Sequence, residues 1–149
     1  MNNDISIRNS VISLKANSIL CREGDLDTDL YIVQEGELLI CSRAGSRVTA
    51  LAKLKEGDYF GEMSFFDENP RSADVISVTD TKLIRIHSTN LKDQLPTWLL
   101  ISVNEMISKL RTLDQVIRDK GIKRQNTNTL KPLSIEEQRA YLEILSKQD

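Results

Sequence analysis

Residues 30–58 read LYIVQEGELLICSRAGSRVTALAKLKEGD, and this stretch decides the fold. Short runs rich in Leu, Ile, Val and Tyr alternate with the segments 34–37, 43–46 and 55–58, each of which contains a glycine. Apolar runs of this length between Gly, Asp and Ser residues favour β-strands joined by tight turns. The stretch therefore predicts strands at 30–33, 38–42 and 47–54.

The same pattern continues on both sides of this stretch. Further brief β-prone pieces occur at 10–14, 18–22, 74–78 and 82–87. About seven or eight short strands at roughly ten-residue spacing are typical of a sandwich or barrel. We expect a mainly β protein with C-terminal helices, in which an N-terminal segment 1–10 precedes an antiparallel, jelly-roll-like β-roll (a double-stranded β-helix) over residues 11–90.

After Ser88 the hydrophobic period changes from that of strands to that of a helix. Apolar residues separated by three and four positions form a seam of nearly three heptads, which predicts one helix over 97–120 within the segment 91–120. The seam residues are Leu99, Val103, Met106, Leu110, Leu113 and Ile117. We expect this helix to pack on the roll at its start and to dimerise along its later turns, as a lid and dimer seam.

The last part of the chain predicts a polar linker and a second helix. Gly121 ends the long helix, and residues 121–133 are mostly polar. Ser134 and Glu137 form a capping box at the start of a short helix within 134–149. Its apolar side comprises Ile135, Tyr141, Leu142 and Leu145. This helix could be a lid, a dimer element or the start of a unit that the chain does not contain.

Composition excludes several classes of protein. The chain has 149 residues, of which 40% are hydrophobic and 28% charged, as in a soluble globular protein with one compact domain. The formal net charge of −2 gives no global reason to bind nucleic acid or an anionic membrane. Residues 109–131 carry a net charge of +5, which we interpret as a solvated helix and linker. We expect no direct binding to nucleic acid and no binding to membranes.

Histidine and cysteine are too scarce for most catalytic chemistry. His87 is the single histidine, whereas zinc enzymes and Ser-His-Asp or Cys-His hydrolases place histidines among specific partners. Cys21 and Cys41 have no metal-binding spacing and are expected to be reduced. The sequence shows no signal segment and no long apolar run. We expect a cytoplasmic protein that is not an enzyme and has no metal.

The chemistry lies in residues 57–75, GDYFGEMSFFDENPRSADV. Gly61 precedes a predicted helical turn at 62–66, whose first N–H groups lack partners, and Pro70 delivers Arg71 towards the same place. Free amides and a guanidinium together form an anion site. Glu62 would repel a simple phosphate, but it can accept a hydrogen bond from a hydroxyl beside the phosphate, as in a ribose cyclic phosphate. The alternative is a structural ion pair between Arg71 and Glu62.

These residues resemble a known family. The sequences FGEMS at 60–64 and PRSA at 70–73 resemble the phosphate-binding cassette of cyclic nucleotide-binding domains. That family includes bacterial catabolite-activator-type regulators, cyclic-nucleotide-gated channels and the regulatory subunits of cyclic-AMP-dependent kinase. Residues 24–25, 29–33, 36–37 and 57–58 stand where that family turns between strands, so the resemblance covers about residues 11–120.

The resemblance implies a role for each residue of the motif. Glu62 would hold the ribose 2′-hydroxyl, and Arg71 would pair with an equatorial phosphate oxygen. The other implied ligand-binding residues are Phe60, Gly61, Met63, Ser64, Ser72 and Ala73. On the long helix only Thr112 offers a neutral hydroxyl near the implied base-capping position, and this match is weak.

One departure from the family pattern is Asp74, which stands where Thr or Ser is frequent. Strand alternation puts Arg71, Ala73 and Val75 on one face and Asp74 on the other, so Asp74 is expected to face away from the ligand. In the family, a hydroxyl at the position of Ser72 is compatible with cyclic AMP and can also favour a guanine. The sequence therefore leaves the base open.

The resemblance implies a sensor that binds cAMP or cGMP as a ligand, uses no cofactor and relays a conformational change through its long helix. We expect a homodimer through 97–120 and a downstream protein or fused effector domain, since the 18 residues from 132 to 149 are too few for a winged-helix DNA reader. The alternatives are a ligand-free structural dimerisation domain, or a domain that binds another anion such as a cyclic dinucleotide.

Overall fold

The computed structural model describes residues 9–88, 92–120 and 131–147. The expected N-terminal segment lies largely outside these residues, as do positions 121–130 of the expected linker. Within the described part the order of elements is β1 (Asn9–Leu14), β2 (Ile19–Cys21), β3 (Leu30–Glu35), β4 (Leu38–Ala44), β5 (Arg47–Leu54), β6 (Tyr59–Phe60), α1 (Glu62–Asp67), β7 (Asp74–Ser77), β8 (Thr81–Ile86), the 3-10 turn η1 (Lys92–Gln94), α2 (Thr97–Lys120) and α3 (Ile135–Ser146).

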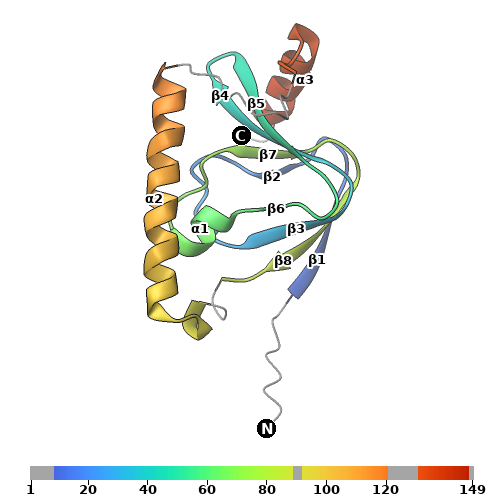
Figure 1. The fold of residues 1–149 in the computed structure, drawn as a ribbon. Coiled ribbons are helices and arrows are strands. Elements are labelled where there is room, and N and C mark those ends of the chain that lie inside the picture. The colour runs from blue at the N-terminus through green and yellow to red at the C-terminus, as the bar shows by residue number, and fades with distance from the viewer. Residues whose placement is uncertain (1–8, 89–91, 121–130, 148–149) are drawn as a thin grey trace.

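The eight strands form two four-stranded antiparallel sheets (Figure 1). One sheet has the order β1-β8-β3-β6 and the other β2-β7-β4-β5. Sequence neighbours such as β4 and β5 pair as hairpins, whereas β1 pairs with β8 from the far end of the roll. The predicted antiparallel β-roll followed by helices is confirmed. The two-residue strand β6 was not predicted, because it is too short to show an alternating pattern.

The main core lies between the two sheets. Buried apolar side chains from both sheets meet there and exclude water, which is the largest favourable contribution to folding. They are Cys21, Tyr31, Val33, Leu38, Phe60, Val75 and Leu83. Strand alternation sends the neighbouring side chains to the outer faces.

A second core lies on the outer face of the β2-β7-β4-β5 sheet, under α3. Leu145 of α3 is fully buried there against Leu39, Cys41, Val48 and Ile76. The helix begins with the predicted capping box, in which Ser134 and Glu137 each satisfy the other's backbone N–H. α3 therefore covers the outer face of a sheet of its own roll.

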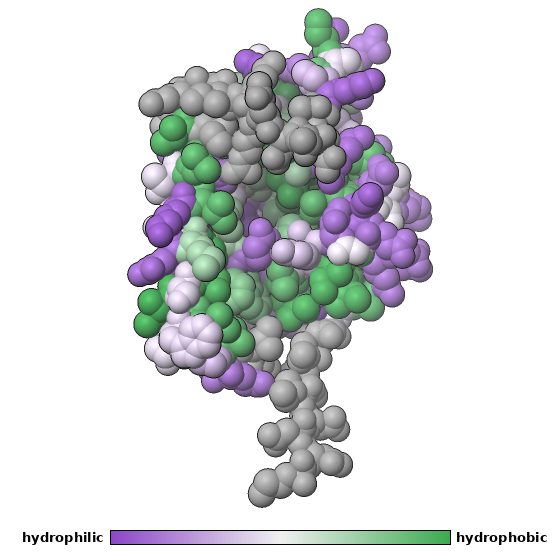
Figure 2. Space-filling model, in the orientation of Figure 1, coloured by the Kyte–Doolittle hydropathy of each residue, from purple (hydrophilic) through white to green (hydrophobic). Residues whose placement is uncertain are grey.

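Helix α2 spans Thr97–Lys120, the predicted range, and stands beside the roll (Figure 1). It packs chiefly against α1, and Ile107 near the middle of α2 is buried. Met106, Leu110 and Leu113 of the seam are exposed. Apolar side chains accordingly run along α2 at the left edge of Figure 2. The side chain of Ile117 lies outside the described residues. Among the helices that the structure describes, none is long and apolar enough to span a membrane.

Candidate functional site

Gly61 connects β6 to α1 and is the tightest point of the site. Its φ of 91° lies in the left-handed region, which favours glycine. A Cβ atom at this position would lie 2.5 Å from Arg71 NH1 and 2.6 Å from the Asp29 carbonyl oxygen. Both distances are shorter than real Cβ contacts allow, so the close approach of Arg71 to the start of α1 requires a glycine here.

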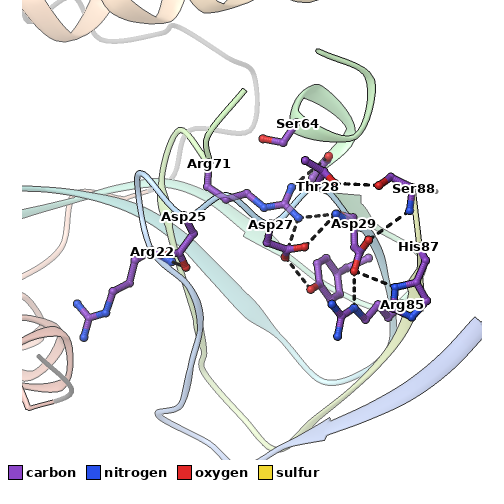
Figure 3. A network of polar contacts seen from close by, with 12 residues as sticks. Arg22, Asp25, Asp27, Thr28, Asp29, Ser64, Arg71, Arg85, His87 and Ser88 are labelled. Carbon is purple, nitrogen blue, oxygen red and sulfur yellow. Dashed lines mark hydrogen bonds and ion pairs between the residues drawn. The ribbon is translucent and has the colours of Figure 1, made fainter. Parts of the chain in front are cut away.

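Arg71 is buried, with 5% of its surface exposed. Its NH2 group donates to Asp27 Oδ2 at 2.9 Å and to the Asp29 carbonyl oxygen at 2.5 Å, and its NH1 group donates to the Gly61 carbonyl oxygen at 3.2 Å. Figure 3 shows Arg71 pointing towards Asp27 and Asp29 while Arg22 points away. The guanidinium thus joins the β2–β3 loop to the start of α1.

Asp27 holds this guanidinium in place. Its carboxylate also accepts hydrogen bonds from the Tyr31 hydroxyl at 2.8 Å and from the backbone N–H of Asp29 at 3.0 Å. Burial alone would raise the pKa of Asp27, but the hydrogen bonds from the Asp29 N–H and from Arg71 outweigh it and lower that pKa below its usual value. Asp27 therefore stays ionised and neutralises Arg71.

An aromatic pair lies beneath the guanidinium. The rings of Tyr31 and Phe60 stack with their centroids 4.9 Å apart, and Arg71 Cζ lies 5.7 Å from the centroid of Tyr31. Phe60, one of the expected site residues, is itself buried. In this structure it supports the site from the core side.

Asp29 links the site to the end of β8. Its carboxylate accepts hydrogen bonds from Arg85 Nε at 2.6 Å and from the backbone N–H of Ser88 at 3.2 Å, and it lies 3.1 Å from His87 Nδ1. Its carbonyl oxygen meanwhile accepts from Arg71. One short loop therefore contacts both the arginine and the point where the chain leaves the roll towards α2 (Figure 3).

Hydrogen-bond donors without a side-chain cap lie at the start of α1, close to Arg71. No side chain caps this helix, so the N–H groups of its first turn, residues 62–64, lack a cap. The Nε atom of Arg71 is also buried and has no hydrogen-bond partner among the described residues. Glu62 is exposed beside these donors, and Arg71 pairs with Asp27 instead of Glu62. The donors suit an anion, and the carboxylate suits a neighbouring hydroxyl.

The remaining residues of the motif lie on both sides of Arg71. Met63 and Ser72 are half-buried, while Ser64 and Ala73 are buried. Asp74 is opposite Cys41 in the β4–β7 ladder and accepts a hydrogen bond from the Glu23 N–H at 2.9 Å. Val75 belongs to the core between the sheets, whereas Cys41 belongs to the core under α3. Asp74 therefore faces the α3 side, as strand alternation predicted.

The contact of α2 with this region comes from Arg111. Thr112, the expected base-capping residue, is exposed, and its hydroxyl donates to the Ser108 carbonyl oxygen at 3.0 Å within the helix. Arg111 instead donates to both carboxylate oxygens of Asp67 and approaches Ser64 Oγ at 3.5 Å. Asp27 was not predicted from the sequence. The only local signal for Asp27 was a pair of aspartates, at 27 and 29, just before a buried strand.

The described residues contain no group of three or more His, Cys, Asp or Glu side chains arranged to hold a metal. Cys21 and Cys41 are both free thiols and both buried. Burial raises the pKa of each thiol to about 12, so neither is a ready nucleophile.

Comparison with known proteins gives consistent matches. A family model described as the cyclic nucleotide-binding domain matches residues 11–97. The cyclic AMP receptor protein of Thermus thermophilus is 42% identical over 65 residues, which cover 43% of this chain and 30% of that protein. The cAMP-dependent protein kinase regulatory subunit of Schizosaccharomyces pombe is 36% identical over 69 residues, which cover 46% of this chain and 16% of that protein.

A solved structure agrees with these matches. The regulatory domain of Toxoplasma gondii PKA with cAMP has a TM-score of 0.56 and 27% identity, covering 70% of this chain and 39% of that chain. The chain spans less than a third of the length of the two curated relatives. The family model, however, matches more than half of this chain and includes the roll and the whole motif around Arg71. This chain therefore belongs to the cyclic nucleotide-binding domain family.

Proposed function

We propose that this chain is a sensor module that binds a cyclic nucleotide, with cAMP as the favoured ligand. Binding would change the conformation of the module, and α2 would pass this change on to a partner or a further domain. The observation that carries the proposal is the buried guanidinium of Arg71. Within the part of the chain that the structure describes, its Nε donor has no partner. Its NH1 group lies close to Gly61, where the uncapped helix α1 begins, and Glu62 in the first turn of α1 is exposed. A cyclic phosphate with an adjacent ribose hydroxyl satisfies all three groups.

In this proposal each residue of the motif has a distinct role. Arg71 and the first-turn N–H groups of α1 bind the phosphate, with Ser72 and Ala73 adding further polar contacts. Glu62 accepts a hydrogen bond from the 2′-hydroxyl. Phe60 supports Arg71 from below through Tyr31.

The choice of cAMP over cGMP rests on the relatives. One curated relative is named as a cyclic AMP receptor and another as a regulatory subunit of a cAMP-dependent kinase, and the Toxoplasma gondii structure is described as a complex with cAMP. The hydroxyl of Ser72 is compatible with either base. cGMP therefore remains the second ligand to test.

The burial of Arg71 supports the proposed relay. Because only 5% of its surface is exposed, a phosphate can reach Nε only if the segments around the guanidinium move. A ligand that binds one arrangement better than another shifts the population towards it. α2, which packs on α1, is the element placed to pass such a movement on.

We further propose a homodimer formed along α2, in a reducing, cytoplasmic environment and without catalytic activity. The exposed seam side chains Met106, Leu110 and Leu113 support the dimer, because an apolar stripe of heptad spacing is stabilised by a second helix. The two buried, free thiols agree with a reducing compartment.

Calorimetric titration with cAMP and cGMP tests the proposal. At ligand concentrations of about 100 μM a site of micromolar affinity fills, so a folded protein that gives no heat with either ligand would refute it. 5′-AMP, which lacks the ring of the cyclic phosphate, should bind more weakly than cAMP. Binding of a cyclic dinucleotide alone would favour the other-anion alternative over the cyclic nucleotide sensor.

Substitution of Arg71 sharpens this test. Arg71→Lys keeps a positive charge but loses the planar fork that reaches Asp27, two carbonyl oxygens and the phosphate together. We expect cAMP affinity to fall by roughly tenfold to a hundredfold, as for the loss of one charge-assisted hydrogen bond. Arg47→Lys, at an exposed position of β5, is the matched control and should bind like the wild type.

A further inference from the structure

The C-terminal end of α1 is held by cations from two later elements. Arg111 of α2 donates from Nε to Asp67 Oδ2 at 2.5 Å and from NH2 to Asp67 Oδ1 at 3.0 Å. Lys92 of η1 donates from Nζ to the Phe66 carbonyl oxygen at 3.1 Å and lies 3.4 Å from a carboxylate oxygen of Glu68. The helix that starts at the ligand site therefore ends in contact with both η1 and α2.

The pair of Arg111 with Asp67 differs from the ordinary surface pairs of this chain. The side chains of Arg111 and Asp67 are 21% and 11% exposed, whereas those of Lys82 and Glu35 are 50% and 59% exposed. A bidentate pair fixes the orientation of the two groups as well as their distance. Burial alone would raise the pKa of Asp67, but the hydrogen bonds from Arg111 and the Asn69 N–H lower it below its usual value. The carboxylate of Asp67 thus remains ionised for Arg111.

Arg111 also approaches two further points of the motif. Its NH2 group lies 3.5 Å from Ser64 Oγ in the first turn of α1, and its NH1 group lies 3.4 Å from the Pro70 carbonyl oxygen, immediately before Arg71. One turn earlier on α2, Ile107 is buried. A displacement of α1 or of the Pro70 turn must therefore move Arg111 or break its contacts.

We propose that Arg111 is a positioning residue that ties α2 to the cassette through Asp67, so that α1 and α2 move as one body when the nucleotide site fills. The part that concerns the ligand rests on the proposed function. A six-residue helix has little stability of its own, so contacts at its ends decide where it lies. The ion pair of Arg111 with Asp67 supplies such a contact, and it connects α1 to the helix that carries the exposed apolar seam.

Hydrogen exchange of the full chain, with and without cAMP, tests this coupling. In the wild type cAMP should change exchange both in α1 and in α2. Arg111→Gln should retain the change in α1 and lose the change in α2, because the side chain that joins them no longer forms the ion pair. Lys109→Gln removes a charge from an exposed position of the same helix and should behave like the wild type. A purely structural role would alter exchange in α2 but would leave its response to cAMP in place.

A double-mutant cycle tests the tie without ligand. Arg111→Gln and Asp67→Asn should each lower the protection of amides around Ile107 by roughly tenfold, and the double variant should show no further loss. Additive losses would overturn the tie, as would a normal α2 response to cAMP in Arg111→Gln. A wild type that binds no cyclic nucleotide would refute the proposed function, and the cycle would still decide whether the tie exists.

Discussion

Alanine at position 61 should damage the site far more than alanine at position 57. The two glycines have nearly the same backbone angle, with φ of 91° at Gly61 and 89° at Gly57. A non-glycine residue at such an angle costs about 1–2 kcal/mol. The surroundings differ, because a Cβ at Gly57 meets nothing within 4 Å. Gly57→Ala therefore isolates the cost of the backbone angle.

Gly61→Ala adds a collision to this cost. The new methyl group would lie 2.5 Å from Arg71 NH1 and 2.6 Å from the Asp29 carbonyl oxygen, so the guanidinium has to withdraw. It would then lose its hydrogen bonds to the carbonyl oxygens of Gly61 and Asp29. At about 1.5 kcal/mol or more for each charged hydrogen bond, the additional loss is about 3 kcal/mol.

Urea denaturation measures the free energy of unfolding of both variants from the midpoint and slope of the transition. We expect the free energy of unfolding to fall by about 1–2 kcal/mol for Gly57→Ala and by about 4–5 kcal/mol for Gly61→Ala. Affinity for cAMP should be near that of the wild type in the first variant and strongly reduced in the second. Equal losses of stability would refute the conclusion that the closeness of Gly61 to Arg71 shapes the site.

Three further predictions concern the rest of the molecule. Leu145→Ala removes a fully buried side chain and should lower the free energy of unfolding by about 2–5 kcal/mol in urea, with cAMP affinity retained. The pKa values of Asp27 and Asp67 lie below the usual 3.8, so their stabilisation is present above the unfolded-state pKa, is complete above about pH 5, and is lost as the pH falls through their folded-state values. The urea midpoint should therefore drop in acid, less steeply in Asp67→Asn than in the wild type. Leu110→Glu should convert a dimer to a monomer in sedimentation experiments, whereas Ile135→Glu, at an exposed position of α3, should leave it dimeric.

Local signals in the sequence were sufficient for the helices and for most strands. The spacing from Leu99 onward and the capping box of Ser134 both depend on neighbours within a few positions, and the structure forms both helices there. Gly36 and Gly45 indicated turns between strands, because glycine tolerates positive φ values, and both residues adopt such values in the structure. Such features need no knowledge of distant parts of the chain.

Features that join distant segments were not predictable in the same way. The partner of Arg71 is Asp27, which lies in the β2–β3 loop 44 residues earlier in the chain, and any of several carboxylates could have filled that place. Which of two adjacent residues, Arg111 or Thr112, turns towards the cassette depends on how α2 packs against α1. The sequence pattern of α3 likewise indicated an apolar side but not the strand face that it covers.

The burial of Leu145 makes α3 part of the packing of the roll. The stretch that this chain shares with its family ends at residue 97, yet a side chain from α3 fills the core on the outer face of the β2-β7-β4-β5 sheet. The match to the family model therefore ends before a helix that contributes to a core of the roll. A protein cut at the end of the matched stretch would lose Leu145 and expose Leu39, Cys41 and Ile76 to water, so we expect it to be less stable than a protein that extends through α3.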